Sequence, residues 1–163
     1  MKKILLLTAL AASFSANAAH KVIHSQGIFT LVQFSDEFTE EVTSCQLNIG
    51  ELAKDKPRIS LFSKPTSDFS SIGLSSYVGS FGGSGYQFKI DNGEVVKKGS
   101  TYAGGDTVFG YISGSKLDEL ASGNKLILRV HPDNQYVDSQ TATYSLKGST
   151  VAINKFKSCL SGS

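Results

Sequence analysis

Net charge and basic runs are almost missing from this sequence of 163 residues. It holds 16 Lys and Arg against 14 Asp and Glu, and two of the cations, Lys2 and Lys3, lie in a segment that we expect to be removed. Their loss leaves 14 residues of each sign and no net charge. Because neutralised phosphates supply most of the affinity of nucleic-acid-binding proteins, this composition predicts no nucleic-acid partner.

Histidine is also scarce, which limits metal and catalytic chemistry. His20, His24 and His131 are the only histidines, and none lies at zinc-ligand spacing from another ligand residue. We therefore predict no metal site and no cofactor. Residues 82–86 lack the last glycine of the G-x-S-x-G nucleophile elbow. A Ser-His-Asp triad of residues distant in sequence stays open, with His24 or His131 as its base.

The N-terminus has the three parts of a secretory signal peptide. Residues 1–3 include two lysines, residues 4–14 are apolar, and Ala16-Asn17-Ala18 forms a small-x-small cleavage site. An anchor helix is the alternative, but the apolar stretch is shorter than the roughly 20 residues that span a bilayer. We therefore predict a signal peptide in residues 1–18 and a single β-rich exported domain in residues 19–163.

The two cysteines agree with export. No long apolar run follows residue 18, so we expect no integral membrane segment after cleavage and a periplasmic or secreted protein. In an oxidising compartment Cys45 and Cys159 should pair, and the bond would restrict the unfolded chain by roughly 4–5 kcal/mol. A metal-binding or catalytic thiol is the alternative, but it needs neighbouring ligands or bases that this sequence does not offer.

The rest of the sequence reads as short strands separated by Gly, Ser, Asn and Asp. Asp91-Asn92-Gly93 is a strong hairpin-turn signal, because Asn-Gly tolerates positive φ at both turn positions. Gly27 is interpreted as a bulge or bend within one long strand. The expected strands are residues 22–34, 58–62, 86–90, 94–96, 107–112, 126–130 and 141–146.

Two short helices are expected among these strands. Residues 115–123 begin with a serine cap and end on glycine, and the S-x-x-K match that starts at Ser113 is also interpreted as a cap. Residues 149–159 place four inward-facing candidates at near-helical spacing: Val151, Ala152, Phe156 and Cys159. The pattern predicts an antiparallel β-sandwich or barrel with one or two short helices and one disulfide.

Residues 70–86 and 99–111 concentrate Tyr, Phe, Ser and Gly, as binding surfaces often do. Alternatively, they form strands whose aromatic residues fill the core. These segments, including Ser84-Gly85-Tyr86, supply the candidate contacts with a protein partner. They are Tyr77, Phe81, Ser84, Gly85, Tyr86 and Tyr102.

The C-terminal third resembles a group of exported bacterial proteins. Its Lys-Leu-x-Leu-Arg-Val strand at residues 125–130, its Tyr-Ser-Leu-x-Gly stretch at residues 144–148 and its terminal helix with Cys159 are similar to the type VI secretion-associated VasI group. In outline they also resemble the invasion-associated locus B proteins. The resemblance implies an exported β-sandwich and carries over no catalytic residue. The sequence departs from these families in having no tryptophan.

A second resemblance, to periplasmic lysozyme inhibitors, concerns Ser84-Gly85-Tyr86, which lacks the spacer expected between Gly and Tyr. Our leading hypothesis is a non-enzymatic exported protein-binding or accessory module with a protein partner in the cell envelope. One alternative is an inhibitor or exclusion protein that blocks a lysozyme-type hydrolase or an incoming phage. The other is a small hydrolase with a non-local triad.

Overall fold

The mainly β architecture predicted from the sequence is confirmed. The computed structural model describes residues 19–50, 57–66, 68–69, 72–77, 83–99, 103–104, 107–132 and 138–161, and the predicted signal peptide lies outside them. Neither helix within these ranges is long and apolar enough to cross a bilayer. In chain order the elements are β1 (Ala19–Gln26), β2 (Phe29–Ser35), β3 (Val42–Ile49), β4 (Arg58–Ser63), β5 (Ile72–Tyr77), β6 (Gly83–Ile90), β7 (Val96–Gly99), β8 (Ala103–Gly104), β9 (Thr107–Ile112), α1 (Gly114–Ser122), β10 (Lys125–Pro132), β11 (Gln140–Ser145) and α2 (Ser149–Ser161).

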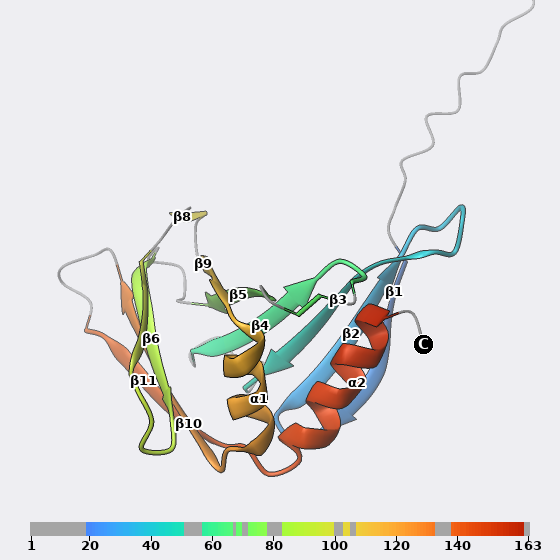
Figure 1. Ribbon diagram of the computed structural model, residues 1–163. Helices are drawn as coiled ribbons and strands as arrows, with labels where there is room; N and C mark the ends of the chain where they lie inside the picture. Colours follow the sequence, from blue (N-terminus) through green and yellow to red (C-terminus); the bar gives the residue numbers. More distant parts are fainter. Residues whose placement is uncertain are drawn as a thin grey trace, which may run out of the picture.

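The larger of two antiparallel sheets has the strand order β1-β2-β3-β4-β5-β9-β8. Side chains alternate along its strands, so that Leu31, Leu47 and Leu61 form one fully buried row across β2, β3 and β4. Helix α2 packs on β2 and β3, and α1 lies beside α2 (Figure 1). One face of this sheet is therefore covered by a helix.

The smaller sheet has the order β11-β10-β6-β7 and forms a separate layer (Figure 1). Its inward positions are apolar, with Phe88 opposite Leu128, and its outward positions are mostly polar, with Gln87 opposite Arg129. The hydroxyl of Tyr144 donates a hydrogen bond to the carbonyl oxygen of Pro57 and so joins β11 to the start of β4. The buried residues of both sheets and both helices form one hydrophobic core.

The N-terminal strand prediction needs one correction. Residues 22–34 form two strands, β1 and β2, because Gly27 adopts a φ of 58° and reverses the chain so that Gln26 pairs with Phe29. Glycine adopts this left-handed conformation without steric cost, which allows the tight turn at Gly27 and Ile28, and the irregularity in the register of β1 lies instead between Val22 and His24. The predicted hairpin at residues 91–93 is confirmed, but β7 starts only at Val96.

Both predicted helices are present. The side chain of Ser113 accepts a hydrogen bond from the backbone N–H of Lys116 at 3.4 Å, which confirms this serine as the cap of α1. In α2, the expected inward residues Ala152, Phe156 and Cys159 are buried. Val151 is instead 48% exposed, because it lies about 140° around the helix from the buried Phe156, whereas Ile153 lies about 60° from Phe156 and is buried.

The disulfide prediction is also confirmed. Cys45 on β3 and Cys159 on α2 are bonded across 114 residues of sequence, with 6.3 Å between their Cα atoms. Both residues are buried. The backbone N–H of Thr66, in the segment after β4, also donates to the carbonyl of Leu160 at 2.7 Å, so a second link holds the last turn of α2.

Reduction of this bond should strongly destabilise the mature protein. Releasing a loop of this length costs roughly 4–5 kcal/mol in the entropic model, which corresponds to a fall in Tm of roughly 10–20 °C. Thermal unfolding with and without reductant measures the change. Reductant should leave a Cys45→Ser/Cys159→Ser double variant unaffected, and an unchanged Tm in the wild-type protein would contradict the prediction.

Among the residues whose side chains the structure describes, Tyr86 has the largest fully buried one, with 1% of its surface exposed. Within the described part of the chain its hydroxyl has no hydrogen-bond partner, and burial raises the pKa of the phenol well above its usual value. An unpaired buried hydroxyl destabilises the folded state.

We therefore expect Tyr86→Phe to raise the free energy of unfolding by about 1 kcal/mol. The matched control is Tyr144→Phe, which removes the hydrogen bond to Pro57 and should lower that free energy by about 1–2 kcal/mol. Urea unfolding of the two variants measures both changes. Destabilisation by Tyr86→Phe would mean that this hydroxyl has a partner after all.

Candidate functional site

The six partner-contact candidates are not gathered on one described surface. Phe81 and Tyr102 lie outside the described residues. Tyr77 ends β5, where its backbone is in register with Arg58 and Thr107, and Ser84 lies on β6. Gly85 and Tyr86 are buried. The burial of Tyr86 leaves no ring surface for a partner, so the expectation of a contact is not met at this residue.

A different surface gathers apolar side chains: the face of the larger sheet opposite α2. Its residues occupy the positions that alternate with the buried rows, and we call them the aromatic face. Val22 and Tyr111 are its most exposed members, at 55% and 63%. The other members are partly buried. The aromatic face consists of Val22, Val32, Phe34, Phe62, Phe109 and Tyr111.

Strand register places much of this face in one continuous row. Val22 on β1 pairs with Val32 on β2, and Val32 pairs with Gln46 on β3. The row continues from Gln46 to Phe62 on β4. Beyond Phe62 it reaches Gly73 on β5 and Tyr111 on β9. Six strands thus contribute to a single row.

The centre of the face is built around Gly73. A Cβ at this position would lie 2.5 Å from the ring of Phe62, so the ring lies directly over the glycine. Phe62 also meets Phe109 edge to face, with ring centroids 6.2 Å apart and an angle of 87°. Because Gly73 has no side chain, the two aromatic rings can pack on the sheet at this position.

A shallow hollow of about 320 Å³ adjoins these rings. It is lined by Phe34, Ser44, Cys45, Gln46, Phe62 and Phe109. The amide of Gln46 donates to Asn48 Oδ1 at 2.8 Å, and the hydroxyl of Ser60 donates to the same oxygen at 2.6 Å. These polar groups bind one another, so the hollow presents aromatic rings and satisfied amides. Such a surface suits binding of an apolar group.

The sequence contains a signal for this face outside residues 70–86 and 99–111, from which the candidate contacts were chosen. In β2 the inward Phe29 and Leu31 alternate with Val32 and Phe34, so the strand is apolar on both faces. A strand of a sheet with one solvated face normally alternates apolar and polar residues. Apolar residues at both the inward and the outward positions of β2 therefore predict that the second face of the sheet is also covered.

The candidate catalytic histidines do not share a site. His24 lies on β1 of the larger sheet, whereas His131 lies on β10 of the smaller sheet. His131 Nδ1 is 2.8 Å from the hydroxyl oxygen of Ser139. Within the described ranges, no three His, Cys, Asp or Glu side chains are grouped so that they could hold a metal ion.

No family model and no curated protein matches this sequence. Among solved structures, the chain is similar to the crystal structure of invasion associated protein B from Bartonella henselae, with a TM-score of 0.58 and 15% sequence identity. The match covers 82% of this chain and 94% of that one. The outline resemblance to the invasion-associated locus B proteins thus extends, as a likeness of fold, from the C-terminal third to most of the chain.

Proposed function

We propose that this protein is a non-enzymatic, exported module that binds another protein of the cell envelope through its aromatic face. The observation that carries the proposal is the partly exposed row of apolar side chains on the larger sheet, opposite the face that α2 covers. The disulfide supports an oxidising location outside the cytoplasm. The fold shared with invasion associated protein B agrees with the resemblance of the C-terminal third to exported bacterial proteins.

The size of the face fits a protein partner. Neighbouring strands lie about 4.8 Å apart, so the six strands from β1 to β9 spread the aromatic face over about 24 Å. A standard protein interface buries about 800 Å² on each partner, which is a patch of similar width. Phe62 and Phe109 at the centre and Tyr111 at the end of the row are of residue types that are enriched at such interfaces.

The partner that fits is an envelope protein with an apolar surface of its own. The residues that line the hollow of the aromatic face are uncharged, and the imidazole of His20 lies at the edge of the face, with its ring centroid 6.4 Å from that of Phe34. The pairing is therefore driven mainly by burial of apolar area. The resemblance to the VasI group favours a component of a secretion apparatus as this partner. The alternative partners are a lysozyme-type hydrolase or a phage protein, and identifying the captured protein distinguishes among them.

We expect a Val22→Ser/Tyr111→Ser double variant to lose partner binding. Both side chains are highly exposed, so the double variant should remain folded while it loses about tenfold in affinity. The measurement is capture of envelope proteins by oxidised residues 19–163, with a photo-crosslinking amino acid at position 111 to locate the contact. The matched control is Val151→Ser, which removes an exposed valine from α2, packed on the other face of the sheet.

Capture that is equally strong in the double variant would overturn the proposed surface. A substrate panel addresses the enzymatic alternative separately. Turnover that is lost in His131→Ala or His24→Ala would overturn the non-enzymatic part of the proposal.

A further inference from the structure

The loop between β2 and β3 exposes a phenylalanine among acidic residues. Phe38 is 97% exposed, more than any other large hydrophobic side chain in the described ranges. Four carboxylates surround it within six residues of sequence: Asp36, Glu37, Glu40 and Glu41. A single exposed apolar side chain is ordinary on a protein surface, so what distinguishes this ring is the set of carboxylates around it.

The loop holds Phe38 in a defined position. The carboxylate of Asp36 accepts hydrogen bonds from the backbone N–H groups of Phe38 at 2.8 Å and Thr39 at 2.9 Å. The N–H of Asp36 donates to the carbonyl of Glu41, and the N–H of Glu40 donates back to the carbonyl of Asp36. Hydrogen bonds from Thr39 and Phe38 lower the pKa of the Asp36 carboxyl, so it stays charged at neutral pH.

The outward face of the smaller sheet has the opposite charge. On this face Lys89 of β6 is in register with Ile127 of β10. One outward position further along, Gln87 of β6 lies between Arg129 of β10 and Lys97 of β7. Lys125 occupies the next outward position along β10. The outward positions on β11 carry the uncharged residues Thr141, Thr143 and Ser145. We call the four cations and the side chains between them the basic face.

The basic face has no internal neutralisation. Arg129 Nε donates to the hydroxyl of Thr141 at 3.1 Å, a bond that leaves its charge uncompensated. Within the described part of the chain, none of the four cations forms an ion pair. Two acidic residues border the face: Asp91, whose carboxylate accepts the backbone N–H groups of Asn124 and Lys125, and the exposed Glu94.

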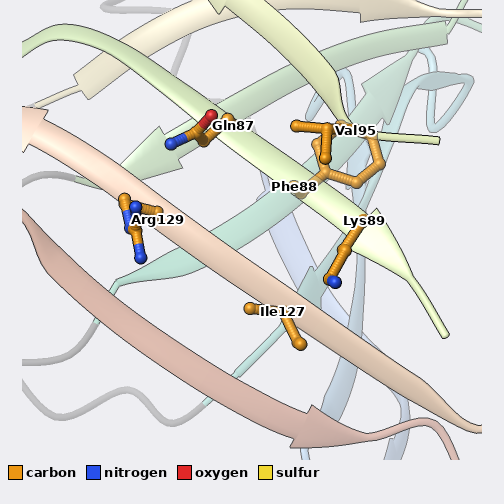
Figure 2. Close-up of a pocket in the computed structure, with 6 residues that line it drawn as sticks. All are labelled: Gln87, Phe88, Lys89, Val95, Ile127 and Arg129. Atoms are coloured by element: carbon orange, nitrogen blue, oxygen red, sulfur yellow. The ribbon is translucent and has the colours of Figure 1, made fainter. Parts of the chain in front are cut away.

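A hollow of about 180 Å³ opens between the cations of this face. Figure 2 shows Arg129 and Gln87 at one end of it and Lys89 and Ile127 at the other, with Phe88 and Val95 on the far side of β6. The apolar part of its wall comes from Ile127 and Val95, because the ring of Phe88 faces the core, and its rim is cationic. An aromatic ring flanked by carboxylates has the complementary chemistry.

The geometry points to head-to-tail self-association, in which the acidic loop of one copy inserts Phe38 into the hollow on the basic face of a second copy. The loop's carboxylates then lie against Lys89, Arg129 and Lys97. The occupant we assign is a second copy of this chain, because the exported domain is neutral overall and yet separates its charges into an acidic loop and a basic face. Such segregation in a neutral chain creates complementary surfaces on one molecule.

The two surfaces cannot meet within one copy. In Figure 1 the loop between β2 and β3 projects at one end of the molecule, and the smaller sheet lies at the other end. The contact is therefore heterologous: each bound copy keeps one free loop and one free face, so association extends as a chain unless its rotation closes a ring. It uses neither Val22 nor Tyr111 and is independent of the proposed partner surface.

Sedimentation of the oxidised mature protein over a range of concentrations tests the proposal. We expect concentration-dependent assembly at low salt that weakens as salt screens the charges. Phe38→Ser should weaken association about tenfold or more, as should the charge reversals Lys89→Glu/Arg129→Glu on the face and Glu37→Lys/Glu40→Lys on the loop. The matched control is Val22→Ser/Tyr111→Ser, which should assemble like the wild-type protein.

The two charge-reversed variants give a sharper test when they are mixed. Each variant alone keeps one charged surface and has one surface of no net charge, because reversing two of four charges leaves two of each sign, so it should associate only weakly. Together they keep one intact pair of surfaces, the acidic loop of the face variant and the basic face of the loop variant, so mixing should restore a one-to-one complex.

A wild-type protein that stays monomeric at every concentration and at low salt would overturn the proposal. Assembly that survives both Phe38→Ser and the charge reversals would also overturn it.

Discussion

The Cys45–Cys159 bond is the constraint on which the arrangement of the two sheet faces depends. It attaches α2 to β3 and so decides which face of the larger sheet is covered. Leu31, Leu47 and Leu61 lie on the covered face and are fully buried. The opposite face receives no helix, and its apolar side chains stay partly exposed. The same bond that completes the core therefore leaves the aromatic face partly exposed.

Two kinds of surface result from this fold, and they differ in physical character. The residues that line the hollow of the aromatic face are uncharged, and the face interacts mainly through burial of apolar area, which is insensitive to salt. The basic face and the acidic loop interact through charge, which salt screens. A protein with both can bind an envelope partner on the side of its larger sheet while its two ends contact other copies. The two activities can thus be separated by variants at different positions.

Much of the fold could be predicted from local sequence because its signals are local. Ser113 caps α1, residues 91–93 turn a hairpin, and Cys159 lies on the inner side of α2, each within a few residues of the pattern that predicted it. The predictions that needed correction depended on finer geometry. Gly27 can serve a bulge or a turn, and only the pairing of Gln26 with Phe29 distinguishes the two. Val151 was predicted to face inward, but it lies outside the buried face of α2, two residues before the buried Ile153.

Periodicity, capping residues and a single pair of cysteines leave few alternatives, so they predict the class of the fold, the disulfide and the short helices. Which apolar side chains are exposed depends on the tertiary structure. Tyr86 is buried, while Val22 and Tyr111, which are far apart in sequence, lie in one row. Strand order brings them together, and strand order depends on long-range pairing that no local pattern specifies.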